Sequence, residues 1–301
     1  MFIAGIDGGG TTAKLQLHDM NGIQICRKEF GPFNLTAVGR DSFISRLREI
    51  FSFCGNMSDC ASLCIGCAGI TKAETSELFR MELANAGFHG ILKLCGDHEI
   101  ALRGAMSGPG CILIAGTGSI AFGKNASGAA VRIGGYGHLI DDRGSGYAIG
   151  RDALALTVQT LDGCIPPNSL ADAVLKFLNA KNSSDIVNYI YAQSSEKSII
   201  AALAPVVLKI CEAGELYGME IIQKNSDDLV RMAETLIRRL SLDNPRIAFA
   251  GGLLNTKNIY STLTADKISQ FADVIQSEHD PLYGAVMLAE EELSRSKRFQ
   301  I

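Results

Sequence analysis

The stretch FIAGIDGGGTTAK occupies residues 2–14 and predicts a strand, a glycine turn and a second strand. Its apolar run ends in Asp7, and residues 15–18 resume the alternation of apolar and polar side chains. Consecutive backbone N–H groups in such a turn can surround an anion, and the threonine hydroxyls add donors. Asp7 would repel a phosphate unless it held a magnesium ion beside it, directly or through water. The alternative is a plain hairpin with a solvated Asp7.

A second stretch repeats this pattern about 110 residues later, at a spacing that suggests an internal repeat. Residues 111–123, CILIAGTGSIAFG, form another apolar run that ends in glycines and hydroxyl side chains before a further strand. The two stretches predict a duplicated architecture with one phosphate-binding turn from each half. A third glycine turn, at 249–253, follows an apolar strand at 246–250, where the backbone could approach a flat ring. Its alternative is a helix start without a ligand.

Length and charge limit the class of protein. The 301 residues suggest about two domains, and the net charge of −4 without a basic stripe argues against a nucleic-acid partner. No apolar run approaches the ~18 residues of a membrane span. The chain enters a strand at once, without a leader pattern, so we expect no membrane partner and a cytoplasmic location.

The nine cysteines mostly lie within apolar runs, as small hydrophobic side chains do in a reducing compartment. Cys64 and Cys67 form a C-x-x-C pair, but no second cysteine pair or histidine pair accompanies them. We therefore expect core packing rather than a redox or zinc role.

The order of segments in the first half predicts α/β layering. Three expected strands within residues 2–30 precede alternating helices and strands. Among these, a buried strand is expected at 61–68, a helix beginning at Thr71 and a short strand at 91–94.

The best domain boundary is Ser107-Gly108-Pro109-Gly110, because it breaks a helix with turn-forming residues. It gives an N-terminal domain of residues 1–108 and a C-terminal domain of 109–301. The second is expected to be mostly helical from 146 to 240 and to end in a helix at about 281–298.

Together the three glycine turns resemble the phosphate and adenosine motifs of the sugar kinase, Hsp70 and actin ATPase superfamily. Residues 6–14 are similar to its first phosphate motif, 113–123 to its second and 248–255 to its adenosine motif. Within the superfamily, the chain most resembles the N-acetylglucosamine kinase branch of the BadF/BadG/BcrA/BcrD ATPase family. A Walker A loop is absent, which excludes a P-loop kinase.

The closer resemblance rests on GPFN at 31–34, on Gly96-Asp97 and on GYGHLIDDRGS at 135–145. It implies a two-lobed, actin-like ATPase fold of the α/β class. Each lobe would be an RNase H-like mixed sheet flanked by helices, with the active site in the cleft between the lobes. The terminal helix would pack back on the N-terminal lobe, and the protein would be a homodimer.

The resemblance also implies an ATP-dependent kinase that phosphorylates the 6-hydroxyl of N-acetylglucosamine or a close relative, with Mg²⁺ held at Asp7. Lys14, Lys124 and Arg132 could reach phosphate, but each lies in an expected strand, where a solvated face is the alternative. The ATP-binding residues that the resemblance implies are Gly8, Gly9, Gly10, Thr11, Thr12, Lys14, Gly116, Thr117, Gly118, Ser119, Gly251 and Gly252.

Asp97 is the candidate general base, because it follows an apolar strand and precedes a helix, where a carboxylate could accept the proton of a substrate alcohol. Its alternative is a helix N-cap. Asn34 and Asp142 match positions that hold sugar hydroxyls in the family; the alternatives are a turn residue and a surface acid paired with Arg143. The implied sugar-binding residues are Asn34, Asp97, Gly135, Tyr136, Gly137, Asp142 and Arg143. His138 is expected to be a packed loop residue.

Arg143 departs from the family pattern, which has an acid at this position. One possibility is that it pairs with Asp141 or Asp142 and holds the loop. The other is that it binds an acidic substituent of the sugar, such as the lactyl carboxylate of N-acetylmuramic acid, because guanidinium and carboxylate match in geometry.

Two other functions stay open at this stage. One is the ATPase activator of a radical dehydratase, a class in the same grouping that holds an iron–sulfur cluster between two subunits through cysteines. The other is a sugar sensor that binds its ligand without turnover.

Overall fold

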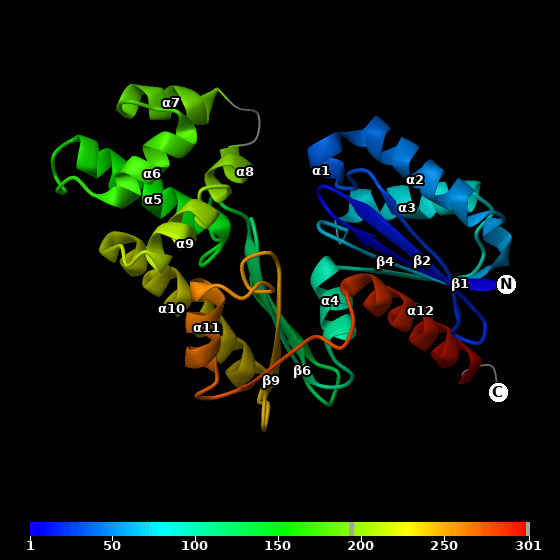
Figure 1. Ribbon diagram of the computed structural model, residues 1–301. Coiled ribbons are helices and arrows are strands. Elements are labelled where there is room, and N and C mark those ends of the chain that lie inside the picture. The colour runs from blue at the N-terminus through cyan, green and yellow to red at the C-terminus, as the bar shows by residue number, and fades with distance from the viewer. Residues whose placement is uncertain (71, 193–195, 299–301) are drawn as a thin grey trace. The chain divides into compact units, whose positions relative to one another are not determined.

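The structure, a computed structural model, describes residues 1–70, 72–192 and 196–298, so the expected helix start at Thr71 lies outside the described residues. The chain divides into two compact units (Figure 1). Unit 1 comprises the residues up to Ser107 and the segment from Ser277 onward, and unit 2 comprises Gly108–Gln276.

Unit 1 is built on a mixed five-stranded sheet with the order β3-β2-β1-β4-β5. The first three strands form an antiparallel meander, whereas β4 and β5 run parallel to β1. Gly8 ends β1, as the sequence predicts, and β2 pairs with β1 from Phe2 opposite Asp19 to Gly8 opposite Ala13. The strands are β1 (Phe2–Gly8), β2 (Ala13–Asp19), β3 (Gln24–Phe30), β4 (Cys60–Cys67) and β5 (Ile91–Cys95).

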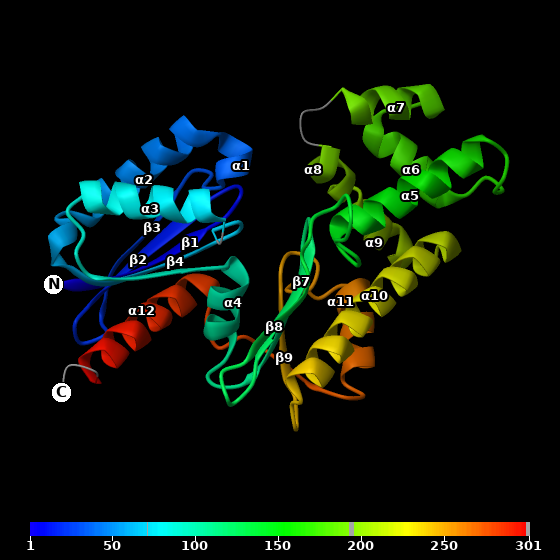
Figure 2. The same cartoon turned by 180° about the vertical axis from the view of Figure 1, so that it is seen from behind.

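Helices cover both faces of this sheet (Figures 1 and 2). On one face, Phe43 and Phe79 pack with Ile6 in one apolar core. On the other, Ile100 and Ala285 pack in a second core. The first face carries α2 (Arg40–Cys54) and α3 (Ala73–Asn85), and the second carries α4 (Asp97–Ala105) and α12 (Pro281–Arg298); α1 (Leu35–Val38) and the 3₁₀ turn η1 (Met57–Asp59) complete the unit.

Two glycines let α12 approach its neighbours closely. A methyl group at Gly284 would lie 2.1 Å from the carbonyl oxygen of Ile100 and 2.5 Å from the amide nitrogen of Gly104, both on α4. A methyl group at Gly5 on β1 would lie 2.6 Å from the amide nitrogen of Val286. The contact of α12 with α4 and β1 is therefore a backbone-to-backbone contact that larger residues would prevent.

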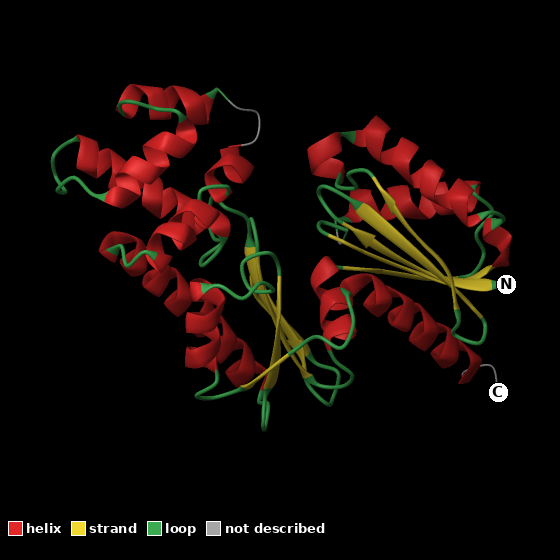
Figure 3. Cartoon of the chain, in the orientation of Figure 1, coloured by secondary structure: helices red, strands yellow, loops and turns green. Residues whose placement is uncertain are grey.

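Unit 2 repeats the topology of unit 1, with the strand order β10-β9-β6-β7-β8. Again three strands form an antiparallel meander, and two later strands run parallel to the first of them. This confirms the duplicated α/β architecture expected from the paired glycine turns (Figure 3). The strands are β6 (Gly110–Ala115), β7 (Ser119–Lys124), β8 (Ala130–Gly134), β9 (Arg246–Ala250) and β10 (Asp273–Ile275).

Most of unit 2 between β8 and β9 is helical, as predicted. One continuous apolar core joins these helices to the sheet, with Ile149, Leu170 and Leu236 among its fully buried members. The helices of the unit are α5 (Gly146–Leu161), α6 (Ser169–Leu178), α7 (Ser183–Tyr191), α8 (Glu196–Ala201), α9 (Ala204–Glu212), α10 (Leu216–Leu240) and α11 (Ile259–Ile268). Among the described residues, no helix combines the length and apolar character needed to cross a bilayer.

The two cysteines of the C-x-x-C pair are core residues. Cys64 and Cys67 are both buried in β4, and Cys64 Sγ lies 3.8 Å from Cys95 Sγ on β5. Burial raises the pKa of the Cys67 thiol to about 12, which suppresses the reactive thiolate. The expectation of core packing is confirmed for these two residues.

Candidate functional site

The first glycine turn connects β1 and β2 in unit 1. The Gly9 amide donates to the carbonyl oxygen of Thr12 at 2.9 Å, which closes the turn and leaves Gly10 and Thr11 exposed. None of Gly8, Gly9 and Gly10 has a positive φ, so the glycines are not needed for an unusual backbone conformation. Gly8 and Gly9 are needed for space, because a methyl group at Gly8 would lie 2.5 Å from the Phe33 ring and one at Gly9 would lie 2.7 Å from the carbonyl oxygen of Thr12.

The segment that contains Asn34 is tied to this turn. The Phe33 amide donates to the carbonyl oxygen of Gly9 at 3.1 Å, and the Phe33 ring is fully buried beneath the turn. Asn34 follows directly, and its carbonyl oxygen accepts from Val38 at 3.0 Å at the start of α1. The structure therefore brings the predicted sugar-binding Asn34 next to the first predicted phosphate turn.

Asp7 and Asp97 lie at the same edge of the unit 1 sheet. Asp7 is near the end of β1, Asp97 follows β5, and β4 between them runs parallel to both. The carboxyl ends of parallel strands are where α/β folds commonly bind ligands. The pKa of Asp7 is raised from its ordinary 3.8 to about 6, mainly by burial. The positive charge of Lys14, which faces Asp7 from β2, lowers this pKa, and the negative charge of Asp97 raises it.

A further acid, Asp280, contributes to this electrostatic environment. It also raises the pKa of Asp7, while Arg27 lowers it. Asp280 accepts a hydrogen bond from Arg27 on β3 and another from the Tyr283 amide at the start of α12. The position of Asp280 beside Asp7 was not predictable, because it depends on how α12 packs against unit 1.

Asp97 presents its carboxylate to solvent, with 51% of the side chain exposed. Its Oδ1 accepts from the His98 amide at 3.0 Å and lies 3.4 Å from His98 Nδ1. The N-cap of α4 is Gly96, and Asp97 is the first residue inside the helix. The alternative that Asp97 caps the helix is therefore wrong, whereas its role as a base stays a prediction.

Asp7 fits the requirements of a magnesium ligand. Magnesium typically binds to proteins through one or two carboxylates and fills its other positions with waters and substrate phosphates. Asp7 is a partly buried carboxylate at the end of β1, directly before the glycine turn, and a nearby cation would offset the burial cost of its charge. Within the described part of the chain, no three His, Cys, Asp or Glu side chains form a ready-made metal cage.

The second glycine turn joins β6 and β7 in unit 2 and is also closed by its own backbone. The Gly116 amide donates to the carbonyl oxygen of Gly118 at 2.9 Å, and Thr117 at the tip is exposed. The carbonyl oxygen of Gly116 accepts from the Gly146 amide at 2.8 Å, which ties the turn to the start of α5. Ser119 donates its hydroxyl to the carbonyl oxygen of Arg143 at 2.6 Å.

Asp142 lies beneath this second turn rather than on the surface. Its side chain is 4% exposed, and its Oδ1 accepts from the Ser119 amide at 3.3 Å. Lys197 Nζ on α8 is 2.7 Å from Oδ2, although this contact lacks the direction of a hydrogen bond. The alternative of a surface acid paired with Arg143 is wrong, and the predicted sugar-binding role of Asp142 stays a prediction.

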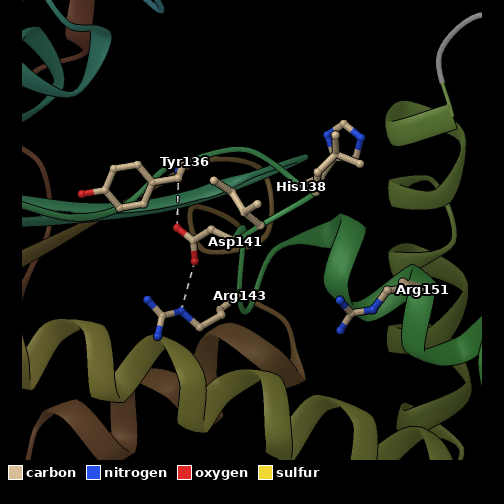
Figure 4. A pocket seen from close by; sticks show the side chains of 7 residues that line it. Tyr136, His138, Asp141, Arg143 and Arg151 are labelled. Carbon is tan, nitrogen blue, oxygen red and sulfur yellow. Dashed lines mark hydrogen bonds and ion pairs between the residues drawn. The ribbon is translucent and has the colours of Figure 1, made fainter.

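The loop that contains residues 135–143 borders an open pocket of about 470 Å³ in unit 2 (Figure 4). Gly135 and Gly137 both have positive φ values, 76° and 91°, which a glycine adopts readily. The pocket is lined by Tyr136, His138, Leu139, Ile140, Asp141, Arg143 and Arg151.

Asp141 organises the loop around this pocket. Its Oδ1 accepts from Arg143 Nε at 3.1 Å, and its Oδ2 accepts from the Tyr136 amide at 3.4 Å (Figure 4). The Arg143 side chain is 51% exposed, so its guanidinium retains solvent access while paired. His138 packs edge-to-face on Tyr147 with ring centroids 5.0 Å apart, as expected for a packed loop histidine.

The basic residues that were candidates for phosphate contacts differ in their surroundings. Lys14 Nζ is 3.8 Å from Glu29 on β3. Arg132 stacks on the Tyr136 ring at 4.6 Å, and Lys124 lies 5.7 Å from the Phe122 ring centre.

The third glycine turn follows β9 in unit 2. Gly251 has φ 84°, and a methyl group there would lie 2.3 Å from the carbonyl oxygen of Ala115 at the end of β6. Gly252 is exposed, with open space where a side chain would be. The turn does not lead straight into a helix, because α11 begins at Ile259, so the alternative of a helix start is wrong here.

Two residues of unit 2 escaped sequence reasoning. Lys197 contacts Asp142 from 55 positions away in the chain, and Arg151 lines the pocket from α5. No motif marks either residue, because both belong to helices in which a lone basic side chain usually faces solvent.

Known proteins resemble this chain over nearly its full length. The model of the BadF/BadG/BcrA/BcrD ATPase family matches residues 4–289. The chain is 29% identical to an N-acetylmuramic acid/N-acetylglucosamine kinase of Clostridium acetobutylicum, covering 97% of this chain and 99% of that one. It is 28% identical to an N-acetyl-D-glucosamine kinase of Dictyostelium discoideum, with 95% and 96% covered.

A solved structure from Chromobacterium violaceum, assigned as an N-acetylglucosamine kinase, superposes with a TM-score of 0.77. It is 26% identical and covers 96% of this chain and 98% of its own. The likeness extends over both units, which agrees with the fold expected from the glycine turns.

Proposed function

The chain belongs to the BadF/BadG/BcrA/BcrD ATPase family, and we propose that it is an ATP-dependent kinase that phosphorylates the 6-hydroxyl of an N-acetylated amino sugar. The observation that carries this proposal is the edge of the unit 1 sheet. There, the exposed carboxylate of Asp97, directly after β5, and the partly buried carboxylate of Asp7, near the end of β1, lie at the carboxyl ends of parallel strands beside an open glycine turn. The names of the relatives from Clostridium acetobutylicum and Dictyostelium discoideum support the choice of an amino sugar.

Each group has a defined task in this reaction. Asn34 holds substrate hydroxyls, since an amide both donates and accepts. Asp97 accepts the proton of the attacking hydroxyl, which a solvent-accessible carboxylate can do. The glycine turns supply amide donors to the phosphates, and Asp7 holds magnesium. When bound, magnesium neutralises charge between the β- and γ-phosphates.

The cysteines support a kinase over an activator of a radical dehydratase. A cluster shared between two subunits needs several cysteines at the surface of each. Of the nine cysteines, Cys164 alone is exposed, while Cys26 and Cys54 are partly buried and the others are buried. A sugar sensor is distinguished by turnover, because it would bind the sugar without releasing ADP.

The test is ADP release in the presence of glucose, glucosamine, N-acetylglucosamine, N-acetylmannosamine or N-acetylmuramic acid. We expect N-acetylglucosamine to be phosphorylated at its 6-hydroxyl. Asp97→Asn should lower kcat by about 100-fold or more and leave sugar binding intact, since a positioned base contributes about that much. Asp41→Asn is the matched control, because Asp41 is also an acid in the first turn of a unit 1 helix. A variant at Asp97 with near wild-type kcat would exclude it as the base.

The pocket of unit 2 favours N-acetylmuramic acid as a second substrate. Arg143 and Arg151 both line it. They pair with Asp141 and Asp152, but each arginine side chain is more than half exposed and can still bind an anion. A lactyl carboxylate would match a guanidinium in geometry and charge. The competing possibility is that Arg143 only holds the loop through its ion pair with Asp141, whose side chain is 7% exposed while that of Arg143 is 51% exposed.

Arg143→Glu separates these two possibilities. If Arg143 binds the lactyl group, the variant should lose kcat/KM for N-acetylmuramic acid by about five-fold or more, relative to N-acetylglucosamine, through lost attraction and like-charge repulsion. Arg231→Glu, which also reverses an exposed arginine paired with an aspartate in unit 2, should affect both sugars equally. If Arg143→Glu lowers kcat/KM equally for both sugars, Arg143 only holds the loop in place.

A further inference from the structure

The second glycine turn contains an arrangement that phosphate binding alone does not explain. A carboxylate, that of Asp142, lies directly against it and accepts from the Ser119 amide at 3.3 Å. A methyl group at Gly118 would lie 2.9 Å from Asp142 Oδ1, so the missing side chain makes room for this acid. An uncompensated negative charge at this place would repel the phosphates of a nucleotide.

Lys197 supplies the missing compensation. Its Nζ is 2.7 Å from Asp142 Oδ2, and it would lie 3.1 Å from a methyl group at Gly118. The lysine side chain is 31% exposed, while the Asp142 side chain is 4% exposed. The ammonium group therefore lies between the buried carboxylate, the turn and solvent. Its contact with Asp142 uses one side of a group that carries three donors.

The position of Lys197 is fixed by close packing of α8 on the start of α5. A methyl group at Gly150 would lie 1.9 Å from the carbonyl oxygen of Ile200, and one at Gly146 would lie 3.4 Å from that of Ala201. Gly146 and Gly150 are one turn apart on α5, so they present one face without side chains to α8. Lys197, on the same short helix as Ile200 and Ala201, is held beside the turn as a consequence.

We propose that Lys197 is a positioning residue for nucleotide binding, which neutralises Asp142 so that the second glycine turn can accept phosphate. The proposal rests on the proposed function, because it takes a nucleotide polyphosphate as the ligand of this turn. Lys197 acts through Asp142 and not by its own contact with phosphate. Loss of the Lys197 ammonium therefore weakens the binding of each ligand in proportion to the negative charge of that ligand. Loss of the Lys197 and Asp142 charges together restores nucleotide binding.

The test is nucleotide binding, measured calorimetrically with ADP and with adenosine. We expect Lys197→Met to weaken ADP binding by about ten-fold, since a like charge left unpaired near an anion is strongly unfavourable, and adenosine binding by less than about two-fold. Lys197→Met combined with Asp142→Asn should return the Kd of ADP to within about three-fold of wild type, because both charges are gone. Lys197→Arg should stay close to wild type.

Lys224→Met is the matched control, because Lys224 also pairs with an aspartate of unit 2, Asp152, at 2.8 Å. It should leave the Kd of ADP unchanged. A double variant that binds ADP as weakly as Lys197→Met, or equal losses for ADP and adenosine, would overturn the proposal. A wild-type protein that binds no ADP at all would contradict the proposed kinase function instead, so the two failures are distinguishable.

Discussion

Replacing Asp7 by asparagine should stabilise unit 1 at neutral pH. Burial holds the pKa of Asp7 at about 6, above its ordinary 3.8, so the folded protein binds this proton more tightly than the unfolded chain. The resulting stability is fully present below 3.8 and is lost as the pH rises through about 6. Each unit of pKa difference between the folded and unfolded states corresponds to about 1.4 kcal/mol. Ionised Asp7 therefore lowers the free energy of unfolding by about 3 kcal/mol at neutral pH, and Asp7→Asn removes this loss.

The assay is urea unfolding of wild type and Asp7→Asn at about pH 4.5 and about pH 7.5, which gives four free energies of unfolding. The increase in the free energy of unfolding of Asp7→Asn over wild type should be about 2 kcal/mol larger at the higher pH, because most of the ionisation of Asp7 in the folded protein occurs between the two pH values. Comparing the two pH values cancels the shared titrating groups that do not interact with Asp7.

Asp19→Asn is the matched control on the same hairpin. Hydrogen bonds from the backbone of Ile23 and Asn21 lower the pKa of Asp19, so its contribution to stability is present at neutral pH and lost in acid. Its replacement should therefore shift the pH dependence in the opposite direction. An Asp7→Asn variant with no gain, or with a gain that is independent of pH, would refute the assignment of a costly buried carboxylate.

Two further predictions concern unit 1. In Asp7→Asn, the magnesium concentration for half-maximal ADP release should rise by about ten-fold or more, because an amide is a poorer ligand than a carboxylate; an unchanged magnesium dependence would exclude Asp7 as the ligand. Gly284→Ala should lower the free energy of unfolding by about 1–3 kcal/mol through overpacking against α4. Gly10 has open space around it, so Gly10→Ala should change the free energy of unfolding by less than about 0.5 kcal/mol. Equal effects of the two substitutions would contradict the close contact of Gly284 with α4.

Local pattern was sufficient to predict most elements of the fold. The apolar run at residues 2–6 and the alternation at 15–18, with glycines between them, predicted β1 and β2. The break at 107–110 also coincides with the end of α4 and the start of β6. Short apolar segments bounded by glycine, such as the one that became β5, were recognisable for the same reason.

The surroundings of the candidate residues were much less predictable. Asp142 lies in a loop of charged residues and reads as a surface acid, but it has φ 62° and a buried side chain. Its partner Lys197 comes from a helix whose packing depends on two distant glycines of α5. Such contacts form between segments far apart in the chain, so neither periodicity nor the spacing of nearby residues predicts them.

The backbone contact of α12 with β1 and α4 has a consequence for synthesis on the ribosome. Unit 2 is one continuous segment and can complete its contacts as soon as its last strand has emerged. Unit 1 cannot, because the surface of β1 at Gly5 stays uncovered until Pro281–Arg298 has been made. At about 5–20 residues per second, that surface waits roughly ten to thirty-five seconds after Ser107 leaves the ribosome. During this time the first segment of the protein is the one most exposed to chaperones and proteases.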